Sequence, residues 1–140
     1  MISLTFSEPV QVGSFSDPAY GLLLGVEAAF VASVDHLVVM EEPNMCIVEL
    51  RQWLHHWLTT GADEDFVYTS IEAEEEGLLT FRRVGATDCA VGSAWSPLPF
   101  EPVSSWDSAI KAARSYVHNV DEWVQKNLGL NVTDAIGDLR

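Results

Sequence analysis

The chain has 140 residues, of which 48% are hydrophobic, so it is long enough to bury a core as one domain and too apolar to be disordered. It carries 21 Asp and Glu residues against seven Lys and Arg residues, and this net charge of −14 argues against nucleic acid or an anionic membrane as a partner. No apolar run approaches the ~18 residues of a membrane-spanning helix, and the N-terminus lacks a signal-peptide pattern, so we expect a cytoplasmic protein.

The N-terminal residues predict short strands joined by turns. Residues 2–6 alternate apolar and polar side chains, which is typical of a half-buried strand, and Pro9 would end it. Further along, Asp35 and His36 would form a turn, after which residues 37–40 return as another strand.

The segment between these strands, residues 20–34, is compatible with two structures. Every even position from Leu22 onward is apolar, which favours one long or bent strand. A helix is only slightly less compatible, because several of the same side chains also recur at helical spacing until Ser33 interrupts them.

The pattern changes to helical spacing after Pro43. Asn44 is a plausible N-cap, and Gly61 would end the helix. The apolar residues that recur at intervals of three and four between them are Ile47, Leu50, Leu54, Trp57 and Leu58.

Residues 63–95 predict three consecutive antiparallel strands, against which the rest of the chain would pack. A three-residue loop ending at Gly77, in the left-handed conformation, would place Glu74 opposite Leu78 and Ile71 opposite Phe81. In this register one face of the hairpin carries Phe66, Tyr68, Glu72 and Glu74, and the other face is apolar.

We first expect Phe66 and Tyr68 to lie under a helix or a neighbouring strand. The alternative is that these two aromatic side chains, surrounded by charge, form part of a partner-binding face.

The C-terminal third predicts one long helix. Prolines 97, 99 and 102 mark an irregular crossing, and a clear amphipathic pattern then runs from Trp106 to Leu128. Ser104 and Asp107 fit a capping box, and Gly129 would close the helix. Residues 131–140 form a short tail with room for one more helical turn. The expected fold is therefore a single α+β domain, residues 1–140, with an antiparallel meander packed against two main helices.

No motif predicts catalysis or a metal site. His55 and His56 are adjacent, so on a helix they point about 100° apart and cannot share a metal from one face. Asp63, Asp65 and Glu74 match three positions of a calcium loop, but Val67 and Tyr68 stand where a ligand and a glycine are required. We therefore expect no cofactor, no metal and no enzymatic activity.

The two cysteines, Cys46 and Cys89, lack the spacing of metal ligands and lie in apolar surroundings. They are best interpreted as reduced core residues.

The run DFVYTSIEAEEEGLLTF, the following VGSAW and the long helix resemble small acidic bacterial proteins of uncharacterised families, which are similar to immunity proteins of toxin–immunity systems. The resemblance covers residues 65–128. It implies a sheet with helices and a non-catalytic task, the occlusion of a toxin by charge and shape. It transfers no functional residue, because immunity proteins do not share one binding motif.

Charge clustering leads to the same hypothesis, because seven of the 15 residues from Ala62 to Glu76 are acidic. An acidic surface can block the basic cleft of a nuclease toxin and accelerate its association. The predicted contact residues for a basic protein partner are Asp63, Glu64, Asp65, Phe66, Tyr68, Glu72, Glu74, Glu75 and Glu76.

Two other functions remain open at this point. One is a small ligand-binding or enzymatic domain with a pocket between the sheet and the helices. The other is a homodimer that forms through Phe66 or through the second helix.

Overall fold

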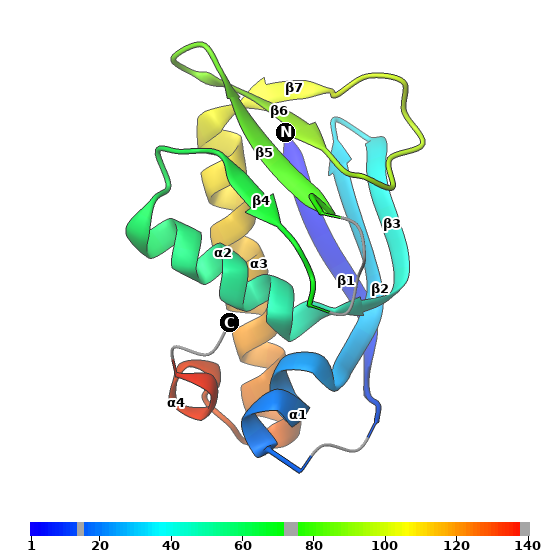
Figure 1. The fold of residues 1–140 in the computed structure, drawn as a ribbon, viewed down its shortest axis with the longest axis vertical. Coiled ribbons are helices and arrows are strands. Elements are labelled where there is room, and N and C mark those ends of the chain that lie inside the picture. The colour runs from blue at the N-terminus through cyan, green and yellow to red at the C-terminus, as the bar shows by residue number, and fades with distance from the viewer. Residues whose placement is uncertain (14–15, 72–75, 138–140) are drawn as a thin grey trace.

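The computed structural model describes residues 1–13, 16–71 and 76–137, and it has the α+β fold that the sequence predicts (Figure 1). The strands form two antiparallel sheets rather than one. The first sheet has the order β1-β2-β3 and the second the order β4-β5-β6-β7. The strands are β1 Ile2–Gln11, β2 Val26–Val34, β3 Leu37–Cys46, β4 Phe66–Tyr68, β5 Leu79–Val84, β6 Asp88–Gly92 and β7 Val103–Ser105.

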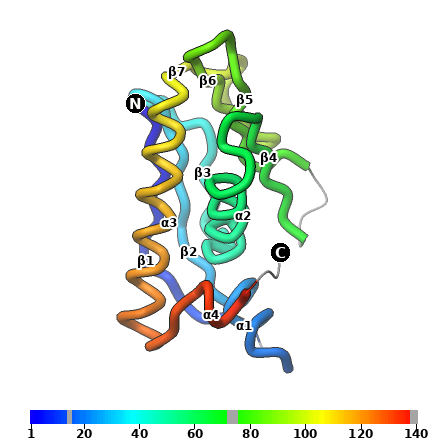
Figure 2. Tube along the Cα trace, turned by 90° about the vertical axis from the view of Figure 1, so that its left-hand side faces the viewer, coloured from blue at the N-terminus to red at the C-terminus, as the bar shows by residue number. Residues whose placement is uncertain are grey.

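Four helices complete the described fold: α1 Pro18–Leu24, α2 Ile47–Thr60, α3 Trp106–Leu128 and α4 Val132–Ile136. Helix α2 lies between the first sheet and β4, as the side view shows (Figure 2). None of the helices in the described ranges is both long enough and apolar enough to cross a membrane.

Aromatic side chains join the two sheets through α2 and α3. Tyr116 of α3 meets Phe6 and Phe30 edge-on, each at 5.8 Å between ring centroids, and its hydroxyl donates to the carbonyl of Ile47 over 2.8 Å. On the other side of α2, Trp57 lies 5.5 Å from Phe66 and 5.8 Å from Phe81. The buried side chains of both sheets therefore form one continuous core.

Strand β1 continues past the position where we expected it to end. Glu8 has a positive φ of 55°, and the pairing of β1 with β2 shifts between Ser7 and Val10. This irregularity accommodates Pro9, which cannot donate to a sheet ladder, on an edge strand.

Both interpretations of residues 20–34 are correct for part of the segment. The Asp17 side chain accepts a hydrogen bond from the backbone N–H of Ala19 over 2.9 Å and starts helix α1, with Pro18 in its first turn. Gly25 ends this helix, and the alternating residues from Val26 onward form β2 with its even positions buried. The expected turn at Asp35 and His36 is confirmed, and both residues have positive φ.

Both main helices end as predicted, and α3 also begins at Trp106 as expected, whereas the start of α2 and the cap of α3 differ from the prediction. Helix α2 starts after Cys46 and not at Asn44, because β3 continues through that point. Helix α3 is capped by Ser105, one residue after the expected Ser104, and the Ser105 hydroxyl accepts from the N–H of Ser108 over 3.1 Å. Gly129 closes α3 in the left-handed conformation, at φ 68°.

The predicted hairpin register is wrong. Phe81 pairs with Phe66 and not with Ile71, and Leu79 pairs with Tyr68. Gly77 has the expected positive φ of 69°, but the connection from β4 to β5 spans residues 69–78. The aromatic contacts with Trp57 favour the observed pairing, whereas the prediction rested on local turn geometry alone. Four residues of the predicted hairpin, 72–75, lie outside the described ranges.

Candidate functional site

Three of the predicted contact residues, Asp63, Glu64 and Asp65, are exposed in the loop between α2 and β4. This acidic loop is held by Arg83 of β5, whose backbone N–H donates to Asp65 Oδ1 over 2.8 Å and whose Nη1 donates to the Asp63 carbonyl over 2.9 Å. The Arg83 guanidinium also lies 4.8 Å from the centre of the Trp106 ring. The loop is therefore fixed through the Asp63 carbonyl and the Asp65 carboxylate, and all three of its acidic residues remain exposed.

Phe66 and Tyr68 are buried, at 2% and 0% exposure, which confirms the first interpretation of these residues. They cannot act as apolar anchors on the free surface, because their rings pack against Trp57 and Trp53 of α2. The exposed residue of β4 is Val67. The face of β4 that was expected to be apolar, which carries Val67, is therefore the exposed face, and this prediction was wrong together with the hairpin register.

The remaining predicted residues belong to the connection between β4 and β5. Glu76 is exposed, whereas Glu72, Glu74 and Glu75 fall outside the described part of the chain. The structure thus places Asp63, Glu64 and Asp65 together as neighbours at the start of β4, and Glu76 at the far end of the connection that follows this strand.

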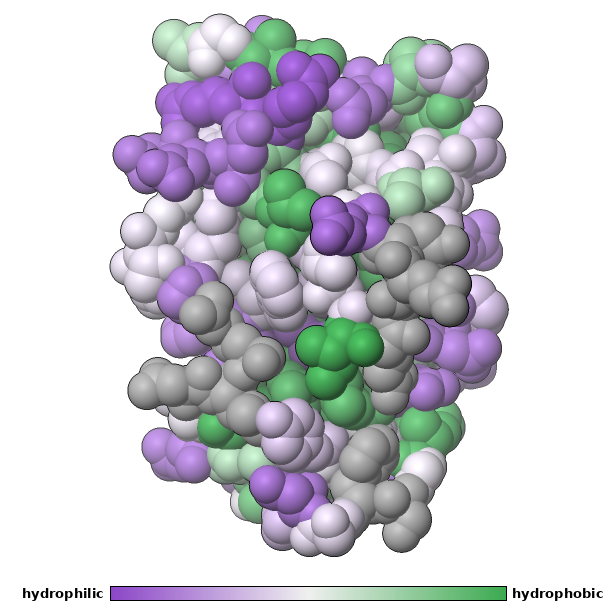
Figure 3. All heavy atoms as spheres, viewed as in Figure 1, coloured by the Kyte–Doolittle hydropathy of each residue, from purple (hydrophilic) through white to green (hydrophobic). Residues whose placement is uncertain are grey.

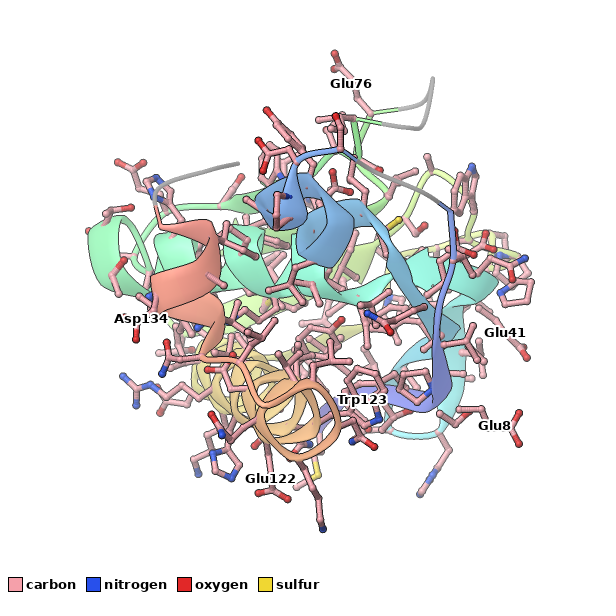
Figure 4. All side chains as sticks on the ribbon, turned by 90° about the horizontal axis from the view of Figure 1, so that it is seen from below. Glu8, Glu41, Glu76, Glu122, Trp123 and Asp134 are labelled. Atoms are coloured by element: carbon pink, nitrogen blue, oxygen red, sulfur yellow. The ribbon has the colours of Figure 1, made fainter. Side chains whose placement is uncertain are left out.

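Carboxylates are also exposed far from the acidic loop. Glu8, Glu41, Glu122 and Asp134 point outward in different directions around the molecule (Figure 4). Residues 1–46 contain six Asp and Glu residues and no Lys or Arg. The negative charge therefore covers much of the surface and is not confined to one sheet face.

A first recess lies between β3 and the β4–β5 connection, and we call it the β3–β4 recess. It has a volume of about 230 Å³ and is open to solvent. Its walls combine the apolar side chains of Met45, Cys46, Leu78 and Trp95 with the polar side chains of Glu42, Asn44, Tyr68 and Ser70. On the face drawn in Figure 3, patches of apolar side chains interrupt the hydrophilic surface.

A buried carboxylate lies behind this recess. Glu49 of α2 is fully buried, and it accepts hydrogen bonds from the Tyr68 hydroxyl over 2.6 Å and from the N–H of Ile71 over 3.2 Å. Burial raises the pKa of Tyr68, and the nearby Glu49 carboxylate raises it further. Tyr68 therefore stays protonated and remains a donor to Glu49 at neutral pH.

A second recess lies between α2 and α4, and we call it the α2–α4 recess. It has a volume of about 370 Å³, and its lining includes Arg51, Gln52, His55 and Thr133. Arg51 is only 2% exposed and forms a two-point contact with Asp121 of α3, Nε to Oδ1 over 2.7 Å and Nη2 to Oδ2 over 3.0 Å.

Further hydrogen bonds from Arg51 and from its neighbour Gln52 attach α4 to α2. Arg51 donates to the side chains of Gln52 over 2.9 Å and Thr133 over 3.2 Å, and Gln52 donates to the carbonyl of Gly137 over 3.0 Å. Burial and the Arg51 charge lower the pKa of His55, so this imidazole is neutral at neutral pH. The polar groups of the α2–α4 recess are thus used largely to dock α4.

Sequence reasoning missed both Glu49 and Arg51, although the helical pattern contained a signal for Arg51. This residue lies four positions after Ile47 and three before Leu54, so it falls on the apolar stripe of α2. A charged residue at a core position requires a partner, but the partner, Asp121, lies 70 residues away in the sequence.

The described residues contain no cluster of three or more His, Cys, Asp or Glu side chains that could hold a metal ion. Cys46 and Cys89 are buried and free of disulfides, as we expected from the sequence. Burial raises the pKa of the Cys89 thiol to about 12, and the Asp65 carboxylate contributes to this rise, so the thiol is protonated and unreactive at neutral pH.

Comparison with known proteins gives one match. Residues 5–126 match a family described as Domain of unknown function (DUF7878). No curated protein and no solved structure matches the chain. The matched residues include both sheets, α2 and most of α3, and therefore both recesses apart from the contribution of α4.

Proposed function

The chain belongs to the DUF7878 family, and because the family description states no activity, we propose a function from the molecular surface: the protein is a non-catalytic binding protein for a basic protein partner. Within that class we propose an immunity-type role, in which the protein occludes the basic site of a toxin. The family match extends over more of the chain than the resemblance on which this role was first based, and it names no toxin or immunity protein.

One observation carries the proposal: most of the surface carboxylates lack a cationic partner. Among the described side chains, ion pairs with Arg involve only Asp121 and Glu101, although 17 of the 21 acidic residues of the chain lie in the described ranges. Glu49 is the one buried carboxylate in the same ranges. Such a surface produces a negative field that steers a basic protein towards it and repels anions.

The acidic loop is the best-defined contact region within this field. Asp63, Glu64 and Asp65 are consecutive and exposed, and the structure shows no ion pair from their side chains to Lys or Arg of the described chain. Arg83 holds the loop through the Asp63 carbonyl and the Asp65 carboxylate, so binding does not require a large entropic cost of ordering the loop. The proposed contact region also includes Glu76, together with Glu72, Glu74 and Glu75, which lie outside the described ranges.

The test pairs the full-length protein with the product of the adjacent gene. Association is measured by surface plasmon resonance at two salt concentrations, and protection is measured as growth of cells that express the partner. We expect a complex whose association rate falls with salt. The triple variant Asp63→Asn, Glu64→Gln, Asp65→Asn should associate about tenfold more slowly, because the long-range attraction is reduced.

The matched control is the triple variant Glu8→Gln, Glu41→Gln, Glu122→Gln, which removes the same number of charges from other exposed positions. It should slow association less than the loop variant does. If the adjacent gene product is not basic, does not bind and is not neutralised, the proposed function is wrong. If both triple variants slow association equally, the overall negative charge accelerates association, but the acidic loop is not the contact region.

The α2–α4 recess favours the alternative function, a small-ligand or enzymatic domain, because it is polar and has a volume of about 370 Å³. Its buried cation, Arg51, is already paired with Asp121, Gln52 and Thr133, however. A ligand would have to compete with these internal bonds. We therefore place the binding of a basic protein first.

A further inference from the structure

We propose that the β3–β4 recess accepts an arginine side chain of the basic partner. This inference rests on the proposed function and adds to it a specific pocket next to the charged surface. The recess has apolar walls for an aliphatic stem, a carboxylate for a guanidinium, and an exposed indole against which the guanidinium can stack.

The size of the recess suits a single side chain. Its volume of about 230 Å³ is below the roughly 300–1,000 Å³ that drug-sized ligands occupy. Met45, Cys46 and Leu78 give it apolar walls, and arginine commonly buries its aliphatic stem against such walls while its charged end stays near water.

The carboxylate of Glu42 is directed towards the recess by the strand. Glu41 and Glu42 are neighbours in β3, so their side chains point to opposite faces of the sheet, and Glu42 is half-buried while Glu41 is exposed. The N–H of Asn44 donates to Glu42 Oε1 over 3.0 Å. The other oxygen, Oε2, receives no hydrogen bond from the residues that the structure describes, and it can accept one from a guanidinium.

The charge around the recess favours a cation over a neutral ligand. No Lys, Arg or His is among the described residues that line it. The Glu49 carboxylate lies directly behind Tyr68 and adds negative potential through a low-dielectric wall. Its own bonds to Tyr68 and Ile71 hold Glu49 in place, so it contributes charge without moving.

Trp95 distinguishes arginine from lysine as the occupant. Its side chain lines the recess and is 38% exposed, so one part of the indole is open to a ligand. The planar and weakly hydrated guanidinium stacks on an indole better than the compact, strongly hydrated ammonium of lysine does.

The test titrates the ¹⁵N-labelled full-length protein with N-acetyl-L-arginine amide and follows chemical shifts by NMR. The matched probe is N-acetyl-L-citrulline amide, which has nearly the same shape but no charge. We expect weak binding of the arginine probe, with shifts centred on the Trp95 indole N–H and on the amides of Cys46 and Ser70. The citrulline probe should bind at least about threefold more weakly, as expected for loss of one partly exposed ion pair.

Variants separate the recess from the general negative field. Glu42→Gln keeps the oxygen that accepts from Asn44 but removes the charge, so it should weaken the arginine probe by about threefold. Trp95→Ala should weaken it by a similar factor. Glu41→Gln removes the same charge from the opposite face of β3 and should leave binding unchanged. Lysine amide should bind more weakly than the arginine probe.

Equal binding of arginine and citrulline, equal effects of Glu41→Gln and Glu42→Gln, or shifts away from Trp95 would each overturn the proposal. The two proposals fail separately. If the arginine probe occupies the recess but the adjacent gene product does not bind, the recess is correct and the proposed function is wrong. If the partner binds equally well to wild type, Glu42→Gln and Trp95→Ala, the function stands without an arginine pocket.

Discussion

Arg51 shows how one buried charge organises the C-terminal end of the molecule. It is 2% exposed, whereas its partner Asp121 is 38% exposed, so the two members of the pair differ in their access to water. A buried charge without a partner is costly, but a carboxylate that reaches solvent can be hydrated when its partner is removed. The two residues should therefore respond differently to substitution.

We expect Asp121→Ala to lower the free energy of unfolding by about 3 kcal/mol, because it leaves the Arg51 cation buried and unpaired. Arg51→Met replaces the cation with an apolar side chain of similar length and should cost less than about 2 kcal/mol. Urea unfolding followed by tryptophan fluorescence measures both values. A larger loss for Arg51→Met than for Asp121→Ala would contradict this account of the pair.

His55 should make the stability of the protein sensitive to mild acid. Burial and the Arg51 charge lower its pKa in the folded state below the ordinary 6.5, so the unfolded chain binds the proton more tightly. The stabilising contribution is complete above about pH 6.5 and is lost as the pH falls below that value. His55→Gln should therefore reduce the loss of unfolding free energy between about pH 7 and pH 5.

The control for this prediction is His118→Gln, since the His118 side chain is 72% exposed. Urea unfolding at the two pH values gives the comparison. An identical loss of stability on acidification in wild type and His55→Gln would show that this histidine is not a source of the pH dependence.

At the scale of elements, the junction between α1 and β2 depends on a glycine. A Cβ added to Gly25 would lie 2.2 Å from the carbonyl oxygen of Gly21 and 3.1 Å from that of Val12. Both atoms belong to the backbone, so a side chain at this position cannot be accommodated by a rotamer change. The close approach lets α1 end and β2 begin within one residue, where the sequence pattern alone favoured a single element.

Gly25→Ala should lower the free energy of unfolding by roughly 2 kcal/mol, because the helix end must move to relieve the contact. Gly61→Ala is the matched control at the end of α2, where an added Cβ meets nothing within 4 Å. It should be neutral or stabilise by about 0.5 kcal/mol through the unfolded state. Thermal and urea unfolding measure the stability of the two variants. Similar losses of unfolding free energy in both would argue against a close backbone contact at Gly25.

At the scale of the whole molecule, the two sheets share one core while the charge lies almost entirely outside it. Helix α2 contributes to both properties, since its apolar side chains meet each sheet and its two buried charged residues, Glu49 and Arg51, have internal partners. The remaining carboxylates repel one another across the surface (Figure 4). Self-repulsion of this kind lowers stability most when salt is scarce.

Raising the salt concentration from ~0.01 M to ~0.15 M, which shortens the screening length from ~30 Å to ~8 Å, should raise the melting temperature by several degrees. The triple variant Glu8→Gln, Glu41→Gln, Glu122→Gln has a net charge of −14 + 3 = −11 and should gain less from the same change. Differential scanning calorimetry measures both shifts. A melting temperature that is independent of salt would show that the surface charges do not interact appreciably.

The sequence by itself determined the α+β class, the position of the two main helices, the glycine at the end of α3 and the burial of both cysteines. These features depend on local periodicity and on glycine conformation, which a short window of residues contains. The acidic character of the surface also follows directly from the composition.

Only the tertiary structure decided the register of β4, the burial of Phe66 and Tyr68, the internal bonds of Glu49 and Arg51, and the two recesses. Each of these depends on contacts between residues distant in the sequence. Trp57 selects the pairing of Phe66 with Phe81, and Asp121 allows Arg51 to occupy a core position. Local patterns cannot encode which distant side chain supplies the compensating contact, because the free energy of that contact exists only once the chain has folded.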